Sequence, residues 1–302
     1  MWFICAILTT LIWGLAELFY KKGAKPDEKY SHLKICVCVG IVMTIHAVYV
    51  LLTEDFNYNP MNIIQYLPVS LLYIISMACS YFGMRFLEES ISDPIENTSG
   101  AIAALLCFLI LKQTIGKLAL VGIILIVIGV VLLSVFEAKD ENGRKKKFGK
   151  KLAIIAFIMP FLYATLDATG SFLDAYYLEL ETSPLIGITE ENIELVANTS
   201  YELTFGIVAL IISIFMLFKK EKMNLVHQKD KWIAAICETA GQFTYVYAMS
   251  GVAIIAAPMI SCVCVVSVIL SRIFLKEKLT KKQYAAIATV IAGILVLSFT
   301  DI

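Results

Sequence analysis

Four carboxyl groups lie within long apolar stretches of the sequence, where an ionised side chain has little water to stabilise it. They are Glu17, Glu96, Asp167 and Glu238. If these stretches cross a bilayer, a charge near its centre costs at least about 2.5 kcal/mol, so such acids face a protein interior or a water-filled cavity. We therefore interpret them as functional candidates. Asp93, Asp174 and Glu202 lie nearer the ends of their stretches, where we expect water to reach them, and are set aside.

Helical spacing places aromatic side chains on the same faces as three of these acids. Residues three, four or seven positions apart share a helix face. The aligned sets are Trp13, Glu17 and Lys21; Tyr163, Asp167 and Ser171; Glu238, Gln242 and Tyr245; and Tyr73, Met77 and Tyr81. An aromatic ring presents its negative π face to a cation, and a carboxylate supplies the opposite charge. The combination is typical of a site for a primary or quaternary ammonium group.

Other interpretations of the same residues stay open. Tyr and Trp are common anchors at membrane surfaces, so some of these rings can serve packing alone. Glu17 can form an ion pair with Lys21 one turn away, and Glu96 near the start of its stretch can favour a helix N-terminus. Glu17 and Asp167 are also candidates for proton coupling. His46 stands alone in its apolar stretch, and we expect a hydrogen-bonded structural role for it.

The elements that must position these groups are membrane-spanning helices. Hydrophobic residues make up 59% of the 302 residues, charged residues 17%, and the mean hydropathy is +0.81, which excludes an ordinary soluble domain. A helical span needs roughly 20 apolar residues, so the chain predicts an all-α integral membrane protein of about ten spans. We expect the spans at 2–20, 34–53, 65–87, 93–111, 116–136, 152–177, 196–218, 232–250, 252–275 and 282–300.

Positive charge marks one side of the membrane. All of the 25 Lys and Arg residues except Lys112 and Lys117 fall in alternate loops, beginning with the first. Because basic loops stay in the cytoplasm, we expect these loops inside and both termini outside. The basic stretch 137–151 (EAKDENGRKKKFGKK) is predicted to be a cytoplasmic linker that fixes topology, rather than a patch for nucleic acid.

The sequence contains an internal repeat. An offset of 164 residues pairs Tyr81 with Tyr245, Pro94 with Pro258, Leu111 with Leu275, Lys112 with Lys276, and Gly129 with Gly293. At the start of each half an offset of 150 pairs Trp13 with Tyr163 and Glu17 with Asp167. The predicted halves are 1–136 and 152–302. Each has an odd number of spans and the two therefore run in opposite directions, an architecture in which transporters bind substrate near the midplane.

The first span carries a recognisable pattern. In LTTLIWGLAELFYKKG, a Trp-Gly pair (Trp13 and Gly14) lies in mid-helix, and a basic residue, Lys21, follows eight positions after the Trp. The fourth and ninth spans each begin near a proline and end Leu-Lys before a Gly-rich span. These features resemble the drug/metabolite transporter superfamily in its ten-span, EamA-like branch. The resemblance implies a transporter fold over the whole chain, in a family whose substrates include amino acids, nucleotide sugars, drugs and quaternary amines.

The expected function is secondary transport. No Gly-x-x-x-x-Gly-Lys-[Ser/Thr] loop is present in the sequence, so a gradient must supply the energy. We expect a carrier, not an enzyme, that moves a small amine or choline-like quaternary ammonium cation by alternating access across a plasma membrane. It needs no metal or cofactor, and its expected partners are the substrate and membrane lipid, not nucleic acid; the sequence leaves the oligomeric state open. Its expected substrate-binding residues are Trp13, Glu17, Tyr81, Glu96, Tyr163, Glu238, Gln242 and Tyr245. An amino-acid exporter of the same superfamily is the main alternative, and a membrane-embedded enzyme or receptor a more distant one.

The topology can be tested with reporter fusions. A reporter that is active only outside the cytoplasm should be active at Ile302 and inactive when inserted at Asn142, because the basic loops are retained inside. A cytoplasmic reporter should give the reverse pattern. Cytoplasmic signal at Ile302 with external signal at Asn142 would contradict the topology.

Overall fold

A computed structural model describes residues 1–25, 27–86, 95–113, 115–140, 150–250, 252–274 and 279–299. Within these ranges every regular element is helical. Most of the predicted linker, the repeat positions Pro94, Leu275 and Lys276, the set-aside acid Asp93, and the C-terminal Ile302 lie outside the described residues.

The described residues form five helices of eight or more residues in the first half and six in the second, and these coincide with the expected spans to within a few residues at most ends. The first half has α1 (Trp2–Gly23), α2 (Ser31–Thr53), the short α3 (Asn62–Gln65), α4 (Leu67–Gly83), α6 (Ser99–Ile110) and α7 (Lys117–Asp140). The second half has α8 (Lys150–Tyr177), α9 (Ile193–Phe218), the single turn η1 (Leu225–His227), α10 (Lys229–Met249), α11 (Ala253–Ile260), α12 (Val263–Phe274) and α13 (Lys281–Ser298). The expected ninth span is therefore divided into α11 and α12.

Length and apolar composition suit these helices to a bilayer. Among the described residues, the segments long and apolar enough to cross it are Trp2–Gly23, Ser31–Thr53, Ile154–Tyr177, Ile193–Phe218 and Ala253–Leu270, the last of which runs through both α11 and α12. Leu67–Gly83, Ser99–Ile110 and Lys117–Leu133 are shorter apolar helices. Large apolar side chains such as Ile124, Leu210 and Ile211 are exposed on the outside of the bundle. Lipid chains are the solvent that such surfaces require.

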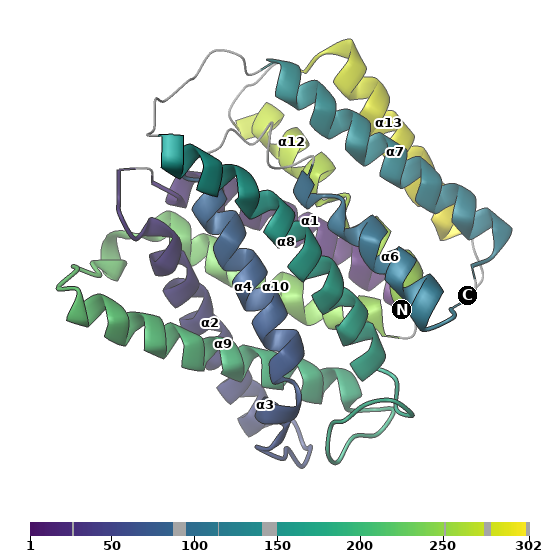
Figure 1. Cartoon of the computed structure of the whole chain (residues 1–302). Coiled ribbons are helices and arrows are strands. Elements are labelled where there is room, and N and C mark those ends of the chain that lie inside the picture. The colour runs from purple at the N-terminus through teal and green to yellow at the C-terminus, as the bar shows by residue number, and fades with distance from the viewer. Residues whose placement is uncertain are drawn as a thin grey trace.

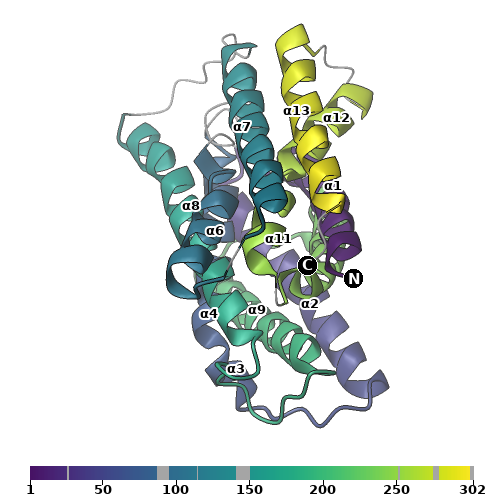
Figure 2. The same cartoon turned by 90° about the vertical axis from the view of Figure 1, so that its right-hand side faces the viewer.

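Repeat-related helices pack against each other in opposite directions. α7 and α13 lie side by side at one edge of the molecule (Figures 1 and 2). Gly122 of α7 meets Leu297 of α13, whereas Gly129, further along α7, meets Val290, nearer the start of α13. The two helices are therefore antiparallel, as an inverted repeat requires. A Cβ atom on Gly293 would lie 2.8 Å from the carbonyl oxygen of Gly122, so glycine is what allows this close approach.

The other helices also pack across the two halves. α2 and α9 are also antiparallel, because Gly40 approaches Ala209 and Thr44 approaches Gly206. α1 packs on α10, and their counterparts α8 and α4 pack on each other in the same way. These two pairs, with α6 and α11 between them, enclose the centre of the bundle. The core is thus an interface between the two halves rather than the interior of either one.

A buried ionic cluster closes one end of this core. Glu28, in the loop between α1 and α2, accepts hydrogen bonds from Lys34 at 2.5 Å and from Lys231 at 2.7 Å. The side chain of Lys231 is fully buried and that of Lys34 is 5% exposed. Arg85, just beyond α4, donates to the backbone carbonyl of Glu28 at 2.6 Å. One acidic residue therefore ties the first loop to α2, α4 and α10.

The charge on Glu28 is held by its two lysines. Burial alone raises the pKa of this carboxyl, but the hydrogen bonds and positive charges of Lys231 and Lys34 outweigh it and hold the pKa at about 2. Because the pKa lies below its ordinary value of 4.5, the stabilisation is present above pH 4.5 and is lost as pH falls toward 2.

The variant Glu28→Gln should destabilise the fold by about 3 kcal/mol at neutral pH, because it leaves two lysines buried without a countercharge. The difference from wild type should shrink below pH 4.5, where the wild-type carboxyl becomes protonated in the unfolded state. Thermal unfolding in detergent, recorded from neutral pH to below pH 4.5, measures this difference in stability. Asp27→Asn, at the exposed neighbouring position, is the matched control. Equal melting temperatures for Glu28→Gln and the control would contradict this role.

Candidate functional site

A central cavity lies between the two halves of the bundle. The space between its walls is about 1150 Å³, a value that includes the part open to solvent. Its walls come from α1, α4, α6, α8, α9, α10, α11 and α12, so both halves contribute. The nine residues that the sequence predicted to bind substrate or to couple protons all lie around this cavity. They are Trp13, Glu17, Tyr81, Glu96, Tyr163, Asp167, Glu238, Gln242 and Tyr245.

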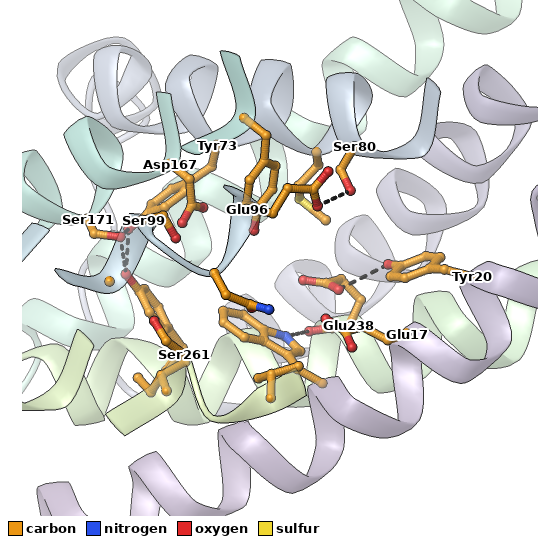
Figure 3. Close-up of a pocket in the computed structure, with 18 of the residues that line it drawn as sticks. Glu17, Tyr20, Tyr73, Ser80, Glu96, Ser99, Asp167, Ser171, Glu238 and Ser261 are labelled. Atoms are coloured by element: carbon orange, nitrogen blue, oxygen red, sulfur yellow. Dashed lines mark hydrogen bonds between the residues drawn. The ribbon is translucent and has the colours of Figure 1, made fainter. Parts of the chain in front are cut away.

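One wall is built by the antiparallel pair α1 and α10. Tyr20 donates from its hydroxyl to Glu238 Oε2 at 3.0 Å, which holds that carboxylate at the cavity edge. Figure 3 shows Glu17 and Glu238 directed into the same part of the cavity. Lys21, which also lines the cavity, donates from Nζ to Ser267 on α12 at 3.0 Å. This wall therefore holds two carboxylates and a cavity-lining lysine.

An aromatic stack continues from the same wall. The ring centroids of Trp13 and Tyr245 lie 5.1 Å apart, and the ring planes are inclined by 29°. The indole of Trp13 fits only because residue 241 is glycine, since a Cβ atom there would lie 2.3 Å from the ring. The indole nitrogen donates to the backbone carbonyl of Glu238 at 3.3 Å. Contacts on both its face and its nitrogen thus fix the ring orientation.

The opposite wall carries two further acids. Glu96 accepts a hydrogen bond from the hydroxyl of Ser80 at 2.8 Å. Asp167 of α8 lies beside Ser99, the first residue of α6 (Figure 3). Because α8 is the repeat counterpart of α1, Asp167 and Glu17 reach the cavity from equivalent helices of opposite halves.

The helices that cross the cavity are interrupted at repeat-related positions. A turn at 97–98 precedes α6, and a turn at 261–262 separates α11 from α12. The offset between them is the 164 residues of the sequence repeat. Asn97 and Ser261 line the cavity at these turns. Interrupted helices in inverted repeats direct backbone groups at a bound solute, which continuous helices cannot do.

The structure adds residues that sequence reasoning missed. The additional polar or aromatic side chains on the cavity wall are Tyr20, Ser80, Asn97, Ser99, Tyr201 and Ser261. Helical spacing could have found Tyr20, which lies three residues after Glu17. Helical spacing could also have found Ser80, which lies in α4 three residues after Met77. Asn97, Ser99 and Ser261 lack a spacing signal because they lie at the helix breaks. Tyr201 comes from α9, for which the sequence pattern indicated no cavity face.

The expectation that water reaches Asp174 and Glu202 is wrong, because both are completely buried. The hydrogen bond expected of His46 is present, since its Nδ1 lies 2.8 Å from both carboxylate oxygens of Glu202. The antiparallel packing of α2 on α9 brings these two residues together, although 156 positions separate them. Pairing of this kind cannot be read from one helix at a time.

Comparison with known proteins finds a family match in each half. The model of the EamA-like transporter family matches residues 1–135 and 182–299. The uncharacterized transporter YetK of Bacillus subtilis is 22% identical over 239 residues, which covers 72% of this chain and 62% of that protein. An uncharacterized protein of Methanocaldococcus jannaschii is 26% identical over 133 residues, which covers 44% of this chain but 95% of that protein. This second relative therefore has the size of a single half.

A solved structure shares the whole fold. A crystal structure of another protein superposes with a TM-score of 0.63 and covers 96% of this chain and 98% of that one. Its sequence identity is 11%, so the likeness concerns the fold alone.

The variant Gly241→Ala should displace the Trp13 indole, because the added methyl group would lie 2.3 Å from the ring. Overpacking of this kind costs about 1–3 kcal/mol in stability. The melting temperature should fall and tryptophan fluorescence should change as the stack with Tyr245 is disturbed. Gly83→Ala is the matched control, since its Cβ atom would meet its nearest neighbour at an ordinary 3.7 Å. Identical stability and fluorescence in both variants would contradict the described fit.

Proposed function

This chain belongs to the EamA-like transporter family, and we propose that its substrate is a small organic cation, an amine or choline-like quaternary ammonium compound. The substrate binds in the central cavity and crosses a plasma membrane by alternating access. The expected topology, with both termini extracytoplasmic, is part of this proposal.

The observation that carries the proposal is the charge of the cavity. Among the described residues that line it, the carboxylates are Glu17, Glu96, Asp167 and Glu238, and the single basic side chain is Lys21. So many acids in one low-dielectric space attract a cation strongly. An anionic solute would be repelled by the same walls. A permanently charged ammonium group matches this field without any change in its own protonation.

The aromatic lining supports the same substrate class. Trp13, Tyr163 and Tyr245 offer ring surfaces beside the acids, and ammonium groups are recognised by such combinations. Tyr81 is only 2% exposed, and its ring lies 4.6 Å from that of Tyr20, centroid to centroid. Gln242 supplies a further polar group on the α10 wall.

The inverted repeat supplies the transport mechanism. Rocking of one half against the other exposes a central site alternately to each side of the membrane. One cavity acid then balances the charge of the cation while another exchanges protons. Glu17 and Asp167 are the candidates for proton exchange because they occupy equivalent places in the two halves and can respond in opposite senses.

Export of amino acids is a second candidate function. The observations that favour it are Lys21 and the two helix interruptions at 97–98 and 261–262, which can donate hydrogen bonds to a carboxylate. In that case the cavity acids bind the amino group of the substrate and exchange protons. Tight binding of a solute without net charge would favour the amino-acid function over the cation function.

Binding calorimetry with the purified protein tests the cation proposal. Choline should bind, whereas its neutral isostere, in which carbon replaces the ammonium nitrogen, should not bind measurably. Trp13→Ala should weaken choline binding by about 0.5–2 kcal/mol, the range of a cation–π contact. Glu238→Gln should weaken it by about 1.5–3 kcal/mol, because a charged partner is lost while shape is retained.

The control for both changes is Glu54→Gln, an exposed acid at the end of α2. Choline affinity should be unaffected there, which separates a local effect from a change in net charge. If the protein ignores ammonium compounds, binds neutral amino acids tightly and tolerates Glu238→Gln, the amino-acid function replaces the cation function.

A further inference from the structure

Asp174 lies on the cavity-facing side of α8 but beyond the cavity itself. Asp167, Ser171 and Asp174 share one helix face at spacings of four and three residues. The first two line the cavity, whereas Asp174 does not. At 1.5 Å per residue it lies about 10 Å further along the helix than Asp167. It is completely buried.

The surroundings of Asp174 are hydroxyl groups rather than cations. Tyr66, on the turn before α4, donates a hydrogen bond to Oδ1, and Oδ2 has no partner among the described residues. Tyr73 and Tyr245 are close enough to interact electrostatically with the carboxyl. No lysine, arginine or histidine in the described part of the chain forms an ion pair with it.

The neighbouring helices add no positive charge. Tyr201 on α9 packs edge-on against Tyr73. α6 contributes Cys107, which faces Glu179 just past the end of α8, and α11 contributes no titratable side chain. An isolated carboxylate in such a place is stabilised by taking up a proton.

Three hydroxyls lie at the part of the cavity wall nearest this carboxyl, and two of them, those of Tyr73 and Tyr245, interact with it electrostatically. Tyr73 and Tyr245 lie 2.6 Å apart, oxygen to oxygen. Either tyrosine hydroxyl can donate a hydrogen bond to Ser171 Oγ, which lies 3.2 Å from the Tyr73 oxygen and 3.1 Å from the Tyr245 oxygen. This Tyr73–Tyr245–Ser171 cluster forms the end wall of the cavity, and Figure 3 shows Ser171 and Tyr73 near Asp167. A hydroxyl can accept a proton on one side and release its own on the other, so the cluster can pass a proton without net change.

We propose that Asp174 is a second proton-coupling carboxyl, which exchanges protons with the cavity acids through the Tyr73–Tyr245–Ser171 cluster. Asp174 is completely buried, so its proton enters and leaves through the cluster and the cavity acids. The proton reaches water on whichever side of the membrane the cavity faces, and one proton is exchanged for each substrate cation that moves the other way. The coupling role rests on the proposed cation transport, but proton binding by Asp174 does not.

Proton binding is tested without any substrate. Infrared difference spectra of the protein in lipid, recorded between acid and alkaline pH, should contain a carboxylic acid band that Asp174→Asn removes. The exposed control Asp27→Asn should retain it. Tyr66→Phe, which removes only the donor to Oδ1, should move the titration of this band to higher pH because the charged form loses a hydrogen bond. A band that is unchanged in both Asp174→Asn and Tyr66→Phe overturns the proposal.

Coupling is tested in liposomes with labelled choline. Asp174→Asn should keep choline binding and counterflow but lose accumulation driven by a pH gradient, for which one pH unit supports up to about tenfold in wild type. Gradient-driven accumulation in Asp174→Asn, or wild-type accumulation driven by sodium instead, overturns the coupling role. If wild type neither binds nor exchanges choline, the proposed function and the coupling role both fail, while the infrared result still decides whether Asp174 binds a proton.

Discussion

The lack of water in the bilayer core is the constraint on which the rest of this structure depends. Every polar group placed there must find its partner inside the protein. The chain meets this demand by collecting its membrane carboxylates along the interface between the two halves, where tyrosine and serine hydroxyls surround them. The outside of the bundle is left to leucine, isoleucine and phenylalanine. Segregation of polar and apolar side chains thus creates the cavity, because acids on different helices can escape lipid only by converging.

Close helix approach makes this convergence possible. Gly40, Gly206, Gly122 and Gly293 let antiparallel helices approach closely, because a Cβ atom at any of them would lie between 2.0 and 2.8 Å from an atom of the partner helix. Such contacts replace the hydrophobic drive that lipid cannot supply. They also keep α2, α9, α7 and α13 out of most of the cavity wall, so that α1, α10, α4 and α8 are free to carry polar faces. Packing helices and cavity helices are therefore largely separate sets.

Sequence reasoning reached far into this site because both of its signals are strong in a membrane protein. Hydropathy locates the helices. An acid within an apolar stretch must face the protein interior or a water-filled cavity, so Glu17, Glu96, Asp167 and Glu238 can be predicted to lie there. Pairings across helices are different. The contact of His46 with Glu202 and the burial of Asp174 depend on which helix packs on which and on what covers its end. The division of the ninth span at 261–262 depends on backbone geometry that apolar composition does not encode.

The fusion of two opposed halves in one chain frees them from having to be alike. A site assembled from two identical subunits must present the same side chains twice, once from each direction. Here the counterpart of Trp13 is Tyr163, and that of Glu17 is the shorter Asp167. Each half can accumulate its own substitutions while the antiparallel α7–α13 contact keeps the pair in register. Two covalently joined halves can therefore evolve an asymmetric pocket that binds the two ends of an asymmetric molecule through different side chains.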